Sequence, residues 1–121
     1  MTAVATLAGA DLALWAARAA KLDSPRIAFD ICRIGPLTDL ARDFCPHEDW
    51  ADGGPLIEQH LIAIAKGANQ ICFPGWHAKV GLVNVYDPIT GRQFGPTPLV
   101  AAMRALVWSV YGDNAPEEVK S

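Results

Sequence analysis

The sequence lacks long hydrophobic runs and paired cysteines, and each absence excludes a class of protein. No apolar run approaches the roughly 20 residues that a membrane-spanning helix needs. The first ten residues, Met1–Ala10, contain no lysine or arginine, so we expect no signal peptide. The three cysteines, Cys32, Cys45 and Cys72, are odd in number and never form a C-x-x-C pair, which argues against a disulfide framework. These features predict a soluble protein of a reducing cytoplasm.

The chain also lacks a basic surface. Ten lysines and arginines face thirteen aspartates and glutamates, which gives a formal net charge of −3 and no basic run. Nucleic acid and anionic membranes are therefore unfavourable partners, because both are bound largely through Lys and Arg.

The overall composition is that of a globular protein. Hydrophobic residues make up 51% and charged residues 19%, unlike a disordered chain. The length of 121 residues fits one domain, residues 1–121, with a polar tail at about 113–121. Because the chain is apolar for its size, we expect a homo-oligomer that covers some of its apolar surface.

Two helices are the clearest signals. The first is predicted from about Gly9 to Lys21, where an apolar stripe recurs at steps of three and four residues. The second is predicted from Pro98 to about Tyr111. Thr97 can cap it, and Gly112 suits the left-handed position beyond its end.

The segment between the helices predicts strands separated by turns. Alternation over Arg26–Ile34 predicts one strand, and the irregular segment 37–54 is expected to end at Gly53-Gly54-Pro55. Residues 56–66 suggest a helical turn and then a strand, although a helix throughout competes. A hairpin is predicted with strands at 70–73 and 78–86. The order favours an α+β fold: a small, mainly antiparallel, three- or four-stranded sheet with two helices packed on one face.

Three segments together resemble the NinX-like family of small bacteriophage and prophage proteins. They are the opening LAGADLALWAARA at 7–19, the central DWADGGPLIE at 49–58, and GPTPLVAAMR at 95–104 followed by YGD at 111–113. The sequence departs from the family at Ala8, where a capping serine is common. The resemblance implies a phage origin and a setting in the host cytoplasm, but no particular chemistry.

The segment that enters the last helix is a candidate anion site. A helix start offers free N–H groups and the positive end of the dipole. Thr97 adds a hydroxyl group and Leu99 adds its backbone amide. Arg92 adds a positive charge that can bind phosphate through two parallel hydrogen bonds. The competing interpretation is an ordinary capped helix beside an exposed arginine.

Aromatic residues in Pro/Gly-rich segments are candidates for stacking on a purine base. These are Trp50 and Trp76, with Tyr86 and Phe94 flanking a predicted turn. The alternative is that they fill the edge of the core or a subunit interface. Arg104, on the last helix, could face solvent, an ion pair or a shared pocket.

Metal and nucleophile sites are weaker candidates. Cys45 and His47 could join Cys72 and His77 at one ion or in a catalytic group, but the spacing does not match zinc sites, and no activated-nucleophile motif occurs. Buried thiols and surface imidazoles are the simpler interpretation. We therefore expect no metal and no cofactor.

A group of carboxylates around Trp50 could hold Mg²⁺ or form a capped turn; it consists of Glu48, Asp49 and Asp52.

The sequence favours a non-enzymatic phage binding module that sequesters a nucleotide-like signalling molecule of host immunity. In this hypothesis Arg92, Thr97 and Leu99 hold phosphate, and Trp50 or Trp76 stacks on a base. One alternative is a protein-interaction module that inhibits or redirects a host protein. Another is a small metal-dependent enzyme acting on nucleotides or nucleic acid.

Overall fold

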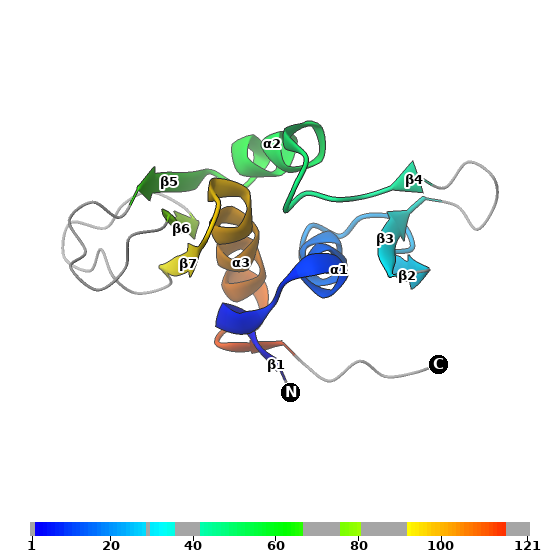
Figure 1. The fold of residues 1–121 in the computed structure, drawn as a ribbon, viewed down its shortest axis with the longest axis horizontal. Coiled ribbons are helices and arrows are strands. Elements are labelled where there is room, and N and C mark those ends of the chain that lie inside the picture. Colours follow the sequence, from blue (N-terminus) through cyan, green and yellow to red (C-terminus); the bar gives the residue numbers. More distant parts are fainter. Residues whose placement is uncertain (1, 29, 36–41, 67–75, 81–91, 116–121) are drawn as a thin grey trace.

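The structure, a computed structural model, describes residues 2–28, 30–35, 42–66, 76–80 and 92–115 (Figure 1). Its elements follow in the order β1 (Thr2–Ala3), η1 (Val4–Thr6), α1 (Gly9–Ala19), β2 (Arg26–Ala28), β3 (Ile31–Ile34), β4 (Arg42–Asp43), α2 (Trp50–Gln59), β5 (Ile62–Lys66), β6 (Trp76–Val80), β7 (Gln93–Gly95), α3 (Pro98–Tyr111) and β8 (Asn114–Ala115). The described strands form two three-stranded antiparallel sheets, β2-β3-β4 and β5-β6-β7, and a β1-β8 pair.

Helix α3 is the centre of the fold. It packs against the β5-β6-β7 sheet on one side and against α1 on the other (Figure 1). Its buried residues occupy most of its circumference: Leu99, Ala101, Ala102, Met103, Ala105, Leu106 and Val107. A helix that is apolar nearly all round is stable only when other elements surround it. The predicted ends are confirmed, because Thr97 Oγ1 accepts the Val100 N–H at 3.2 Å and Gly112 has a φ of +78°.

Helix α1 links α3 to the β2-β3-β4 sheet. Its buried side chains are mostly alanines and leucines, which allow the helix to pack closely against α3. On its other side it packs against β3, from which Cys32 and Ile34 are buried. The Trp15 ring contacts Tyr111 edge-on, with centroids 5.1 Å apart. One apolar core therefore extends from α3 through α1 to β3.

The α+β class is confirmed, but the strands are divided between sheets. The segment Arg26–Ile34 was predicted as one strand, and this prediction is wrong. The chain reverses around Asp30, which has a φ of +64°, so Ile31 pairs with Ala28. The two-residue turn reverses the alternation: Ile27 pairs with Cys32, and the buried residues of β3 are Cys32 and Ile34, whereas Ile31 is exposed. The apolar residues at 27 and 31 therefore suggested one continuous face that the paired strands do not have.

The predicted break at Gly53-Gly54-Pro55 is also wrong, because α2 runs through it. The Asp49 side chain caps this helix by accepting the Ala51 N–H at 2.9 Å. Gly53 lies too close to Pro46 and Leu99 to carry a side chain, so tertiary packing overrides the helix-breaking tendency of Gly53-Gly54-Pro55. The strand predicted after this helix is confirmed as β5.

Other boundaries also differ from the prediction. Strand β7 was not predicted, and β6 begins at Trp76, two residues before the predicted strand. The predicted strand at 70–73 and most of that at 78–86 lie outside the described residues. Strand β8 pairs with β1, and Ala115 is fully buried, so the first residues of the expected tail belong to the packed fold.

Candidate ligand site at three helix starts

The turn between β4 and α2 is held in place by a single carboxylate. Asp52 Oδ2 accepts the Cys45 N–H at 2.9 Å, and Asp52 Oδ1 accepts a hydrogen bond from Arg42 Nη1 at 2.7 Å. The Asp52 side chain is only 11% exposed, whereas that of Arg42 is 59% exposed, so the bond from Cys45 is the more shielded of the two. The result is a defined path for residues 45–49, which carry His47 and Glu48.

A glycine contact fixes the start of α2 against the start of α3. A Cβ atom on Gly53 would lie 2.4 Å from Pro46 O and 2.7 Å from Leu99 Cδ2. Only glycine therefore permits this approach. The turn, the start of α2 and the start of α3 thus form one unit.

A hollow of about 420 Å³ lies where these elements meet. It is lined by His47, Glu48, Trp50, Thr97, Pro98 and Leu99. Trp50 is 56% exposed, an unusually large apolar surface for an aromatic residue at a helix start. We refer to this site as the larger hollow.

The first turn of α3 leaves one amide for a ligand in the larger hollow. Pro98 has no N–H, the Val100 N–H binds Thr97 Oγ1, and the Ala101 N–H binds Thr97 O at 3.1 Å. The Leu99 N–H has no acceptor among the described residues. It lies at the positive end of the helix dipole, where an anionic atom is favoured.

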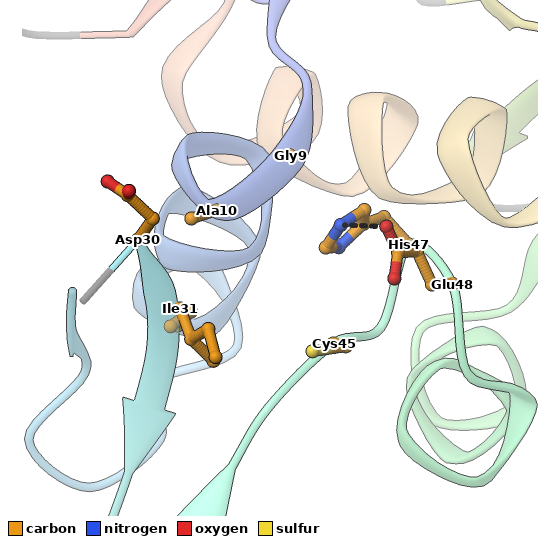
Figure 2. Close-up of a pocket in the computed structure, with 8 residues that line it drawn as sticks. Gly9, Ala10, Asp30, Ile31, Cys45, His47 and Glu48 are labelled. Carbon is orange, nitrogen blue, oxygen red and sulfur yellow. Dashed lines mark ion pairs between the residues drawn. The ribbon is translucent and has the colours of Figure 1, made fainter. Parts of the chain in front are cut away.

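A second hollow, of about 240 Å³, lies on the other side of His47 (Figure 2). We refer to it as the smaller hollow. Its lining is Gly9, Ala10, Asp30, Ile31, Cys32, Cys45, His47 and Glu48. Both hollows share His47 and Glu48, so the 45–48 turn forms the wall between them.

His47 is the buried polar side chain of this wall. It is 8% exposed, and its Nε2 lies 3.4 Å from Glu48 Oε1. Its Nδ1 has no hydrogen-bond partner within the described residues. Burial lowers the pKa of His47, and the neighbouring Glu48 opposes this shift. Near neutral pH the imidazole is therefore uncharged.

The thiols of the smaller hollow are kept protonated. Burial, followed by the nearby Cys45, raises the pKa of Cys32 to about 11. Burial, followed by nearby carboxylates of which Glu48 is the largest cause, raises the pKa of Cys45. A protonated thiol is a poor nucleophile and a poor metal ligand. Among the described residues no group of three His, Cys, Asp or Glu side chains could hold a metal ion, and Cys72 lies outside them.

The family model described as Bacteriophage P22, NinX matches residues 3–109. The chain belongs to this family. The match confirms the resemblance and identifies a bacteriophage accessory protein. It spans every residue that lines the two hollows. No curated protein matches the chain. No helix in the described part of the chain is long and apolar enough to cross a membrane.

Three of the predicted site residues of this NinX-family protein meet at one place: Trp50, Thr97 and Leu99 line the larger hollow. Trp76 and Phe94 instead belong to strands β6 and β7, where Trp76 packs against the core.

Arg92 directly precedes β7, so it also belongs to the side of the third sheet. Burial lowers the pKa of His77, and the charge of Arg92 lowers it further, which indicates that the two side chains are neighbours. The Phe94 ring also contacts His77, with ring centroids 6.2 Å apart. None of these three residues lines the larger hollow.

The Arg104 side chain binds backbone carbonyl groups instead of facing a pocket. Its Nε donates to Leu7 O at 2.8 Å and its Nη1 donates to Phe94 O at 2.7 Å. Burial lowers its pKa. Arg104 therefore ties the segment before α1 and strand β7 to α3.

Sequence reasoning assigned no ligand role to the start of α1. Its N-cap position is occupied by Ala8, which makes no side-chain hydrogen bond. The available signal was the absence of Ser, Thr, Asp or Asn at this position. That His47 lies beside Gly9 and Ala10 depends on tertiary structure, which a local pattern does not show.

Proposed function

We propose that this NinX-family protein is a non-enzymatic, homo-oligomeric binding module that sequesters a small nucleotide-like signalling molecule of host immunity in the host cytoplasm. The observation that carries the proposal is that the exposed Trp50 lines the larger hollow together with Leu99, whose N–H has no acceptor among the residues that the structure describes.

Trp50 differs from its neighbours in the same segment. Asp49 caps α2, Asp52 holds the preceding turn, and Gly53 allows the helix starts to touch. Trp50 keeps more than half of its surface in water, so the fold gains little from it. An aromatic face of this kind contributes about 1–3 kcal/mol when a nucleic-acid base stacks on it.

The rest of the larger hollow offers polar groups suited to a base and an anion. The Leu99 N–H can donate to a phosphate oxygen at the start of α3. The Thr97 oxygen already accepts from Val100, but its O–H proton can still be donated. Glu48 can accept N–H groups of a base, and its charge favours a ligand that carries few phosphates. The proposal therefore assigns ligand contact to Trp50, Thr97 and Leu99.

Native mass spectrometry of the purified protein tests this function, because it reports the oligomeric state and any retained small molecule together. We expect an added mass of a few hundred daltons per site that is released on denaturation. Affinities for a panel of mononucleotides then compare wild type with Trp50→Ala. The expected loss is about tenfold, from the stacking energy. Leu61→Ala, which truncates another exposed apolar residue, is the matched control. Equal affinities of wild type and Trp50→Ala would remove the proposal.

A protein-interaction module is the second candidate, favoured by a further set of exposed apolar side chains: Ile27, Ile31, Trp50, Leu61 and Val110. Capture from host lysate separates it from the first. A stoichiometric host protein that is lost with both Trp50→Ala and Leu61→Ala supports this candidate. Loss of a small ligand with Trp50→Ala alone supports the first.

A further inference from the structure

Helix α1 begins without a side-chain cap. Ala8 occupies the N-cap position in an extended conformation, and its carbonyl accepts the Leu12 N–H at 3.3 Å. The N–H groups of Gly9, Ala10 and Asp11 have no acceptor among the described residues. By contrast, Asp49 caps α2 and Thr97 caps α3. The start of α1 is therefore the helix start with the most unsatisfied donors.

Two of the residues that carry these donors, Gly9 and Ala10, line the smaller hollow, which also carries a second unsatisfied group. Gly9 and Ala10 form one wall, and His47 forms another. Figure 2 shows the imidazole directed from the 45–48 turn toward α1. Its Nδ1 exposes less than 1 Å² and has no hydrogen-bond partner in the described part of the chain. The χ2 torsion of histidine is soft, so a ligand in the hollow can draw Nδ1 toward it by a small rotation of the ring.

The charges around His47 determine what the hollow can accept. The titratable groups that line the smaller hollow with His47 come from the turn and the β2-β3 hairpin: Cys45, Glu48, Asp30 and Cys32. The starts of α1 and α2 carry Asp11 and Asp49, which do not line it. The thiols are neutral, as described above. Glu48 pairs with Nε2, and the Asp30 carboxylate is directed away from His47 (Figure 2). On the other side of the 45–48 turn, the residues at the start of α3 that line the larger hollow (Thr97, Pro98 and Leu99) are all uncharged.

We propose that the smaller hollow binds one tetrahedral oxyanion, the group found in inorganic phosphate and in phosphate esters, through the N–H groups of Gly9 and Ala10 and through His47 Nδ1. The volume of about 240 Å³ equals that of roughly eight waters at about 30 Å³ each, so the oxyanion fits with part of its hydration. This site is separate from the larger hollow and does not depend on the function proposed for it.

Binding at this site takes up a proton. His47 must carry a proton on both nitrogens if Nε2 is to face Glu48 while Nδ1 donates to the oxyanion. The oxyanion stabilises the imidazolium, so it binds more tightly when the pH falls from 7.5 to 5.5. Sulfate is the appropriate probe, because its own charge does not change over this range.

The test is a titration of ¹⁵N-labelled protein with sodium sulfate, followed through the backbone amide resonances, with sodium chloride at equal ionic strength as the reference. We expect saturable shifts of Gly9 and Ala10 that exceed those in chloride. Affinity should be about tenfold higher at pH 5.5 than at pH 7.5, the size of one charge-assisted hydrogen bond. A parallel titration with ribose 5-phosphate distinguishes the sources: tighter binding than sulfate indicates a phosphate ester, and equal binding indicates a free oxyanion.

Two variants and one control variant test the assignment. Ala8→Ser supplies a hydroxyl that accepts a first-turn N–H, so it should weaken sulfate binding about tenfold while α1 stays helical. His47→Gln should remove the pH dependence. His60→Gln should leave it unchanged, although His60 Nε2 also has no partner in the part of the chain that the structure describes. Wild-type affinity in Ala8→Ser, or shifts no larger than in chloride, would overturn the inference. Shifts confined to Leu99 would also overturn it while supporting the larger hollow.

Discussion

Replacing Gly53 and Gly54 in turn by alanine provides a sharp test of how the larger hollow is built. Both glycines lie inside α2, and neither has a positive φ. A Cβ on Gly54 would have nothing within 4 Å, whereas a Cβ on Gly53 would lie 2.4 Å from the carbonyl oxygen of Pro46. The two variants therefore share the same change in helix propensity and differ in this contact.

The expected changes in the free energy of unfolding combine a gain in helix propensity with the cost of a steric clash. Alanine in place of glycine inside a helix stabilises by about 0.5–1 kcal/mol, so Gly54→Ala should raise the free energy of unfolding by that amount. Gly53→Ala gains the same term, but a backbone oxygen cannot move aside as a side chain can. Overpacking of this kind costs about 1–3 kcal/mol. Gly53→Ala should therefore be less stable than Gly54→Ala by about 1–3 kcal/mol.

Urea unfolding followed by circular dichroism measures the difference. The amide resonances of Glu48, Trp50 and Leu99 report whether the larger hollow has opened, and we expect them to shift in Gly53→Ala and to stay in place in Gly54→Ala. If the two variants are equally stable, the contact between α2 and the Pro46 carbonyl is not as close as the structure shows. The account of the site would then be wrong.

Three further predictions concern the turn, the end of α2 and pH. Asp52→Ala removes the acceptor for Cys45 N–H and the partner of Arg42, so urea unfolding should show a loss of about 1.5–3 kcal/mol, with Asp52→Asn losing less. Leu61 has a φ of +53°, so Leu61→Gly should stabilise by about 1 kcal/mol and Leu61→Ala should not. Burial lowers the pKa of His47 below the unfolded value of 6.5, so its contribution to stability is present above about pH 6.5 and is lost as the pH falls through the folded pKa. In chloride buffer, His47→Gln should lose less stability between pH 7.5 and pH 5.5 than wild type does.

The two long helices were predictable because their signals are local. The apolar stripe of α1 and the Thr97 and Gly112 signals around α3 are contained within a few turns of chain. The path of α2 was not predictable, because a glycine such as Gly53 normally indicates the end of a helix. Gly53 is needed here for its close contacts with Pro46 and Leu99, and Leu99 is 46 positions away in sequence.

The candidate site was predictable only in part, for the same reason. Trp50 and Leu99 stood out as an aromatic residue in a glycine-rich segment and as a helix start, and the structure places them on one hollow. His47 was considered for metal binding or catalysis. Its position between two hollows results from the packing of residues 45–48 against both α1 and α3, which no local pattern encodes.

The shared wall of the two hollows makes a further prediction about a nucleotide-like ligand. Among the described residues the start of α1 leaves three N–H groups without an acceptor and the start of α3 leaves one. A nucleotide whose base stacks on Trp50 therefore has a single amide for its phosphate at Leu99 and a stronger phosphate contact across His47 in the smaller hollow. A ligand that spans His47 in this way links two weak contacts and binds more tightly than either fragment, because the second contact becomes intramolecular. Sulfate should then compete with a mononucleotide for the protein but not with the corresponding nucleoside. If sulfate and mononucleotide bind independently, the two hollows are separate sites, and the base and the oxyanion belong to different ligands.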